Sequence, residues 1–215
     1  MYKIQVNKAA LQNHLHYDWW KYVIGIIATV FVWSMVTAMT RPQTPPEKKV
    51  DIFLVGGFAF DEALNALSVK MLKDFPQLLE INFTNIVLEG DPQLEIAGRQ
   101  KLMVMLGSQT GDIFVFSREE FEMLARQGAF LPLDGVMDDI IEAKIPYEEM
   151  DEHRIAVEDD EGQKGEPRIY GLPLNDTVVF DDAFFDVENK VIAVMAYSRN
   201  MENAVDVIRW LMDKE

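Results

Sequence analysis

Few residues in this chain are placed to do covalent chemistry. The 215 residues include no Cys and only 3 His, so a thiol nucleophile, a disulfide and a thiolate metal site are all excluded. His14 and His16 lie beside a long apolar run, and His153 lies in an acidic stretch. The sequence contains no Gly-x-Ser-x-Gly, P-loop or Gly-x-Gly-x-x-Gly motif. We therefore predict that the protein is not an enzyme and uses no cofactor.

The acidic stretch Glu158–Gly162 is the one segment whose composition suggests a metal ion. Alternating carboxylates with glycine at position six and glutamate at position twelve form a calcium loop, and this spacing is not met here. Runs of like charge usually form solvated loops. We predict a solvated loop and no metal site.

Residues that follow predicted strands are the better candidates for binding a ligand. Gly57, Phe58 and Phe60 follow the apolar run Val50–Val55, and Phe116 and Ser117 end the run that begins at Ile113. Ligands of open α/β sheets bind at the carboxyl ends of the strands, so these five residues are candidate ligand contacts. The alternative for Phe58 and Phe116, which applies to Tyr170 as well, is that they pack in the core or at the edge of the lobe.

The elements that would position these residues alternate regularly along the chain. Each predicted strand is followed by a predicted helix, which is typical of a mostly parallel sheet covered by helices on both faces. The predicted strands are Val50–Val55, Ile81–Leu88 and Ile113–Phe116; the predicted helices start at Asp61, at Asp91-Pro92 and after Ser117. The first helix is expected to be capped by Asp61 and ended by Pro76, and the second to end near Leu106.

The third predicted helix has the clearest boundaries. Ser117 is a typical N-cap residue, and Glu119 and Glu120 favour the first turn because the helix dipole is positive there. Gly128 follows the last apolar position, where a left-handed C-terminal residue is needed, and Phe130 is placed to pack back on the helix end.

A membrane anchor is predicted near the start of the chain. Tyr22–Met39 is 18 residues long and carries no charge, and aromatic residues gather at its beginning, as at a membrane interface. A signal peptide usually has a shorter apolar core, and a buried core helix would not need the Pro-rich spacer Arg41–Lys49 that follows. We predict a juxtamembrane segment at 1–21, a transmembrane helix at 22–39, a linker at 40–49 and a globular domain at 50–215.

Charge is divided unevenly between these parts. The first 50 residues hold 6 Lys and Arg against 2 Asp and Glu, whereas the remaining residues hold 14 against 34. An acidic domain of this kind is not suited to bind nucleic acid, since phosphate contacts need clustered basic residues. An anionic membrane surface would also repel it.

Three motifs in order resemble a known family. They are the strand–helix unit Gly111–Asp134 ending in Leu-Pro-Leu-Asp, the sequence Tyr170-Gly171-Leu172-Pro173, and the strand and helix within Val191–Leu211. They resemble the first lobe of the extracytoplasmic solute-binding proteins of bacterial ABC transporters. This resemblance implies a Rossmann-like α/β lobe of the periplasmic-binding-protein fold, adds Tyr170 by the hinge as a ligand-contact candidate, and places the domain outside a cell membrane that the chain crosses once.

The resemblance also implies that the second lobe of such a protein is missing. Only 17 residues separate Pro173 from Val191, where the second lobe would lie. Two lobes close around a solute in that family, so one lobe is expected to lack high-affinity capture. We predict a membrane-anchored solute-binding-like protein, accessory to or derived from an ABC transporter, with an ABC permease or another membrane protein as partner. The alternative is a non-catalytic interaction module that docks a membrane or cell-surface partner through the exposed face of the lobe.

Overall fold

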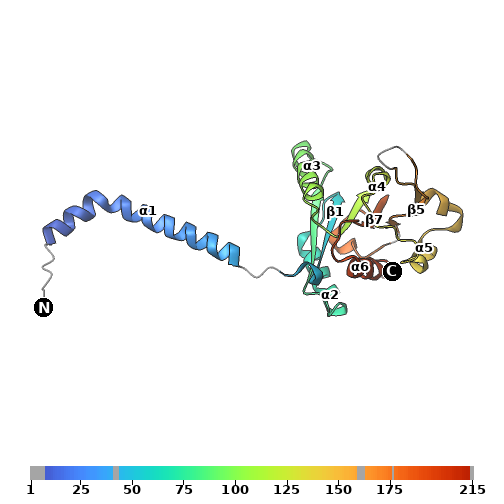
Figure 1. Cartoon of the computed structure of the whole chain (residues 1–215), viewed down its shortest axis with the longest axis horizontal. Coiled ribbons are helices and arrows are strands. Elements are labelled where there is room, and N and C mark those ends of the chain that lie inside the picture. The colour runs from blue at the N-terminus through green and yellow to red at the C-terminus, as the bar shows by residue number, and fades with distance from the viewer. Residues whose placement is uncertain (1–7, 41–43, 159–162, 176, 214–215) are drawn as a thin grey trace. The chain divides into compact units, whose positions relative to one another are not determined.

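The computed structural model describes residues 8–40, 44–158, 163–175 and 177–213 (Figure 1). The chain divides into two compact units, Met1–Gln43 and Thr44–Glu215, and each is described by itself. This division falls within the predicted linker at 40–49, and the predicted domain limits remain predictions.

The first unit is built around one helix, α1 (Lys8–Thr40). Within it, Trp19–Thr40 is long and apolar enough to cross a membrane, and none of this segment is buried. At 1.5 Å per residue its 22 residues span roughly 33 Å, which matches a hydrocarbon core of ~30 Å. The alternative of a buried core helix is therefore wrong for this segment.

The second unit is an α/β domain whose central sheet is mostly parallel. The sheet has five strands in the order β2-β1-β3-β7-β6. Strands β1, β2 and β3 are parallel, β7 runs antiparallel to β3, and β6 runs antiparallel to β7. The strands are β1 (Lys49–Gly56), β2 (Glu80–Val87), β3 (Ile113–Ser117), β6 (Leu172–Pro173) and β7 (Lys190–Val194).

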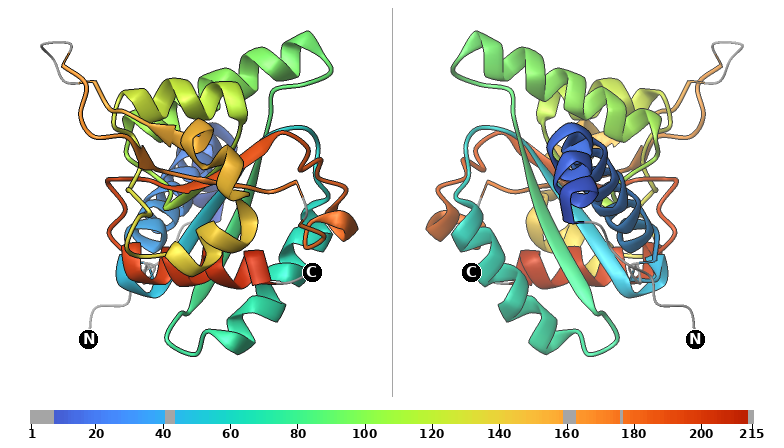
Figure 2. Two further views of the ribbon diagram at one scale, coloured as in Figure 1. Left: turned by 90° about the vertical axis from the view of Figure 1, so that its right-hand side faces the viewer. Right: turned by 90° about the vertical axis from the view of Figure 1, so that its left-hand side faces the viewer.

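Helices cover both faces of this sheet (Figure 2). The long helices are α2 (Asp61–Asp74), α3 (Pro92–Gly107), α4 (Arg118–Arg126) and α6 (Met201–Asp213), and α5 (Asp138–Lys144) is shorter. The remaining elements are the 3-10 helices η1 (Pro46–Lys48), η2 (Tyr147–His153) and η3 (Asp181–Ala183) and a separate pair of strands, β4 (Arg154–Ile155) and β5 (Arg168–Ile169).

Successive side chains of a strand point to opposite faces of the sheet, and this produces two hydrophobic cores. In β1, Ile52 and Leu54 point to the side covered by α2, α5 and α6, and Phe53 and Val55 point to the side covered by α3 and α4. All four are buried, as expected for a strand with helices on both faces. The predicted fold class, a mostly parallel sheet with helices on both faces, is confirmed.

The helix boundaries follow their local signals. The Asp91 carboxylate accepts a hydrogen bond from Gln93 N (2.7 Å) and caps α3, and Gly128 has the left-handed φ of 74° that was expected after α4. The Phe130 ring stacks on Phe121 of α4 with centroids 5.1 Å apart. One boundary differs: Phe60, rather than Asp61, is the N-cap residue of α2, because its carbonyl accepts the first helical hydrogen bond, from Leu64 N (3.1 Å).

Candidate binding site at the carboxyl ends of the strands

One edge of the central sheet gathers the ends of five strands. Parallel β1, β2 and β3 end there, at Gly56, Val87 and Ser117. Strand β7 begins there, because Lys190 pairs with Ser117, and β6 ends there, because Pro173 pairs with Val191. We call it the strand-end edge, because it runs across the ends of the strands and not along an outer strand. Open α/β sheets bind ligands at the carboxyl ends of their strands.

Lys190 forms an ion pair across this edge. Its side chain is 7% exposed, and its Nζ lies 3.2 Å from Oε1 of Glu89, which follows β2. Between the two residues lies the end of β1, where Gly56 has a φ of 132° and no Cβ to obstruct the lysine side chain. Glycine is favoured here both by the backbone conformation and by the close approach of Lys190.

A pocket of about 250 Å³ lies beside Lys190 on the β6 side of this edge. We call it the strand-end pocket. Five separate parts of the chain supply its wall: the start of α4, the end of α5, η2, the end of β6 and the start of β7. The lining residues are Arg118, Lys144, Pro146, Glu149, His153, Pro173, Asn175, Asn189, Lys190 and Val191.

Hydrogen bonds from backbone N–H groups join three of these segments. Arg118 N donates to the Asn189 carbonyl (3.0 Å), and Asn189 N donates to Oδ1 of Asn175 (3.1 Å). Asn189 has a φ of 56°, a conformation that asparagine adopts more readily than most residues. Leu174 N donates to the Lys190 carbonyl (3.0 Å). The part of the wall formed by these three segments is therefore held in place by hydrogen bonds within the chain.

The pocket concentrates basic side chains in an acidic domain. Arg118, Lys144 and Lys190 line it, against a single acid, Glu149. The Arg118 Nε lies 3.1 Å from Oε1 of Glu122, which is partly exposed. Among the described residues, Lys144 has no ion pair, and it is half-buried.

His153 is partly buried in the same wall. Burial lowers its pKa, and the positive charge of Arg118 lowers it further; Glu149, Glu152 and Glu122 act in the opposite direction without reversing the shift. The imidazole is therefore neutral at neutral pH, with one N–H donor and one acceptor nitrogen.

Ser117 lies next to the pocket and is engaged in capping α4. Its Oγ accepts a hydrogen bond from Glu120 N (3.4 Å) and donates one to Oε2 of Glu120 (3.0 Å). Because its hydroxyl already has two partners, Ser117 shapes the end of β3 and sets the position of Arg118.

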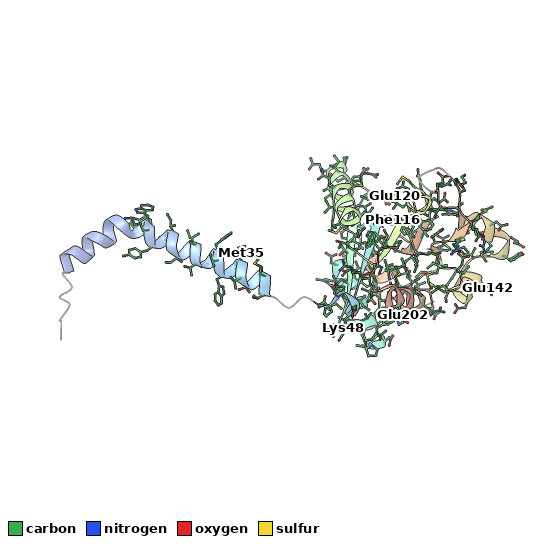
Figure 3. The ribbon with its side chains drawn as sticks, in the orientation of Figure 1. Met35, Lys48, Phe116, Glu120, Glu142 and Glu202 are labelled. Atoms are coloured by element: carbon green, nitrogen blue, oxygen red, sulfur yellow. The ribbon has the colours of Figure 1, made fainter. Side chains whose placement is uncertain are left out.

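The structure places the other predicted ligand-contact residues in two different settings. Gly57 is half-buried beyond β1, and Phe58 and Phe60 are 59% and 49% exposed. Phe116 is fully buried within the domain (Figure 3), stacked on Phe114 at 5.3 Å, and Tyr170 is buried in the same core. Phe116 and Tyr170 thus show the core packing that was the alternative for such residues.

A second, apolar feature adjoins the strand-end edge. The rings of Phe58 and Phe60 meet edge to face at 5.0 Å, and Phe60 meets Phe184 in the same way at 5.3 Å. Phe184 is 73% exposed and has a φ of 54°. We call these three residues the aromatic triad. An exposed phenylalanine in a left-handed conformation is rare and marks a place where a functional constraint is worth testing.

The basic residues of the pocket are not among those predicted from the sequence. Arg118 directly follows Ser117, which was a candidate, and Lys190 directly precedes the buried strand residues Val191 to Val194. A lysine at the start of a fully apolar strand is unusual, because buried lysines need a partner, and this pattern could have indicated Lys190. Lys144 and His153 carry no comparable signal, because only the fold brings α5 and η2 to this edge.

Metal binding has no structural support in the described part of the chain. Groups of three or more His, Asp or Glu side chains placed to hold an ion are absent from the described residues. Most of the acidic stretch Glu158–Gly162, positions 159–162, lies outside the described residues.

Comparison with known proteins gives partial structural matches. No protein-family profile matches the chain, and no curated protein matches it at the significance required. A family 1 extracellular solute-binding protein from Alicyclobacillus acidocaldarius is 21% identical, with 61% of this chain and 29% of that chain covered and a TM-score of 0.39. The chain is thus similar to part of a solute-binding protein.

Two further solved structures give the same result. An ABC substrate-binding protein from Listeria monocytogenes in complex with cycloalternan is 17% identical, with 57% and 28% of the two chains covered and a TM-score of 0.36. An ABC transporter solute-binding protein from Agrobacterium vitis with bound D-mannitol is 17% identical, with 59% and 27% covered and a TM-score of 0.38. The chain spans less than a third of the length of each of these three proteins.

Proposed function

We propose that this protein is a membrane-anchored, extracytoplasmic and non-catalytic binding module that serves a transporter in the same membrane, such as an ABC permease. The observation that carries the proposal is the strand-end pocket, where polar side chains from five parts of the chain converge at the carboxyl ends of the strands. A concave site with a few convergent polar groups is typical of a small-molecule site. Gly57 and Ser117 flank this site in the proposal.

The anchor and the pocket are attached to opposite edges of the same sheet. The Pro-rich linker enters the domain at Lys49, the first residue of β1, and the strand-end edge begins at Gly56, the last. Eight residues at ~3.3 Å each separate the two edges by roughly 26 Å. Within the domain, the pocket is therefore well removed from the point where the anchor joins.

A single lobe contacts its ligand from one side. Small-molecule sites that bury most of their ligand bind it best, and a pocket formed by one lobe leaves much of a ligand in water. We propose millimolar rather than micromolar affinity, so that the protein gathers or hands over a solute instead of retaining it.

Thermal shift on the full chain in lipid nanodiscs tests this function. The panel contains sugars, polyols, amino acids and organic anions, each at 0.1 and ~10 mM. One class should raise the unfolding temperature at the higher concentration, because a ligand in excess over Kd stabilises the folded state. If no class stabilises the protein at ~10 mM, the binding function is rejected.

The location proposed for the domain has its own test. The chain has no native Cys, so single cysteines can be introduced and labelled in intact cells with a maleimide that does not cross membranes. Cysteine in place of the exposed Ala66 on α2 should be labelled, and cysteine in place of Gln5 should react only after lysis. The reverse pattern contradicts an extracytoplasmic domain.

The aromatic triad supports a second candidate, docking of a protein partner. Phe58, Phe60 and Phe184 expose three rings at one place, and the ring of Phe60 contacts the other two. Exposed apolar groups of this kind are typical of interaction sites. The double variant Phe58→Ser/Phe184→Ser should abolish partner capture in crosslinked membranes while leaving the thermal shift by solutes unchanged, whereas capture that persists argues against docking by the triad.

A further inference from the structure

We infer that the strand-end pocket binds a small organic anion through a carboxylate or phosphate group. The inference rests on the proposed function, because it names the class of ligand for the pocket that the binding function uses.

Hydrogen-bond donors dominate the wall. The contacts of the Arg118 side chain use Nε, which leaves both of its terminal Nη groups without a partner among the described residues. Lys144 likewise has no polar partner in the described part of the chain, so its ammonium adds three donors. The planar end of a guanidinium matches the two oxygens of a carboxylate or phosphate, and a lysine ammonium complements it as a point charge.

The charges of the wall favour an anion over a cation. Three basic side chains oppose only Glu149 in the lining. The acids that pair with two of them, Glu89 and Glu122, are 60% and 37% exposed and therefore well solvated and screened. Lys144 forms no ion pair with any acid of the described residues. Residues 51–215 include 34 acidic and 14 basic residues, so a pocket lined mainly by basic side chains differs in charge from the rest of the domain.

The neutral groups of the wall fit the same ligand. His153 is held in its neutral form and offers one N–H donor, and the Asn175 amide keeps its Nδ2 donors after its Oδ1 has accepted from Asn189 N. The lining contains no Phe, Tyr or Trp ring, so it lacks the large apolar stacking surface that suits the apolar face of a sugar. A volume of about 250 Å³ is below the ~300–1,000 Å³ of sites for drug-sized molecules, so the ligand is small.

Calorimetric titration of the full chain in nanodiscs of neutral lipid tests the inference. The titrants are sodium phosphate, sodium succinate and maltose, with sodium chloride matching the ionic strength. We expect saturable binding of phosphate or succinate, and the tighter of the two identifies the oxyanion. Lys144→Gln and Arg118→Gln should each weaken it by about tenfold or more, as for the loss of a charge-assisted hydrogen bond. Arg118→Lys, which keeps the charge but not the planar fork, should give an intermediate loss.

The matched control is Lys73→Gln. Lys73 is exposed on α2 and outside the pocket, and its substitution changes the net charge by the same amount. Anion binding should be unchanged in this variant; an equal loss would mean that general surface charge, and not the pocket, binds the anion. Circular dichroism establishes that each variant is folded.

The results separate the ligand class from the proposed function. If maltose binds and Lys144→Gln leaves its affinity unchanged, the anion is rejected while the binding function stands. If the anions do not bind but another solute of the thermal-shift panel does, the anion is likewise rejected and the binding function stands. If nothing in the panel or the titration binds, both are rejected.

Discussion

The Nζ of Lys190 lies 3.2 Å from Oε1 of Glu89, across the end of β1, although the two residues are 101 positions apart in the chain. The pair is unequal, because the lysine side chain is 7% exposed and that of the glutamate 60%. Glu89→Gln should lower the free energy of unfolding by about 1 kcal/mol, since it leaves a buried ammonium without its counter-charge while water still reaches the site.

Lys190→Met is the matched variant for this pair. It removes the buried charge itself and keeps a similar apolar stem, so its effect on stability should be smaller than that of Glu89→Gln. Urea unfolding of both variants measures the difference. A larger loss for Lys190→Met would show that Lys190 contributes more through its ion pair than the desolvation of its charge costs.

Replacing each of two glycines of α3 by alanine should have opposite effects on the free energy of unfolding. A Cβ at Gly98 would overlap the Val87 carbonyl oxygen and lie 3.0 Å from Cδ2 of Leu88, so α3 can approach β2 only without a side chain there. Gly98→Ala should lower the free energy of unfolding by about 1–3 kcal/mol. Gly107, at the end of the same helix, has nothing within 4 Å, and Gly107→Ala should raise it by up to ~1 kcal/mol. Equal effects in urea unfolding would contradict this packing.

The sequence predicted the elements whose signals are local. The Ser117 cap, the left-handed Gly128 and the Asp91 cap are each set by residues within three positions of a helix end, and all three are present. The alternation of strands and helices likewise depends on short apolar runs. The fold class follows from these local signals alone.

The binding pocket could not be predicted in the same way. Lys144, His153 and Lys190 meet Arg118 only because β7 returns antiparallel beside β3 and because α5 and η2 fold over that edge. The helix α5 itself lies in an acid-rich stretch, where Ile140 and Ile141 are its buried residues. Contacts between residues far apart in the chain leave no periodic signal in the sequence.

Replacing Phe184 by glycine tests whether the aromatic triad is maintained at a cost to stability. Phe184 has a φ of 54°, a conformation that costs a residue with a side chain roughly 1–2 kcal/mol, and its ring is largely in water. Phe184→Gly should therefore raise the free energy of unfolding by about 0.5–1 kcal/mol. The control Phe58→Gly, at a position without positive φ, should lower it. Destabilisation by both variants would mean that the triad stabilises the fold and is not selected for contact with a partner.

The lowered pKa of His153 leads us to expect that stability depends on pH. Burial, aided by Arg118, places its folded-state pKa below the usual value of 6.5, so the unfolded chain binds the proton more readily. The contribution of His153 to stability is then complete above pH 6.5 and is lost as the pH falls through the folded-state pKa. The difference in unfolding free energy between the wild type and His153→Gln, measured from pH 8 to 5, should shrink as the pH falls. A difference that grows toward acid pH would mean that the protonated imidazole is the stabilised form.

The globular unit should fold without the anchor. Thr44–Glu215 forms a compact unit of its own, with two apolar cores, one on each face of its sheet, and the linker enters at the first residue of β1. The fragment 44–215 should therefore be soluble without detergent, and it should unfold in one cooperative urea transition because both cores share the same sheet. Because α1 supplies no buried side chain from residue 19 onward, the fragment should unfold at the same urea concentration as the full chain in nanodiscs. An insoluble fragment beside a folded full chain would show that residues before Thr44 complete the domain.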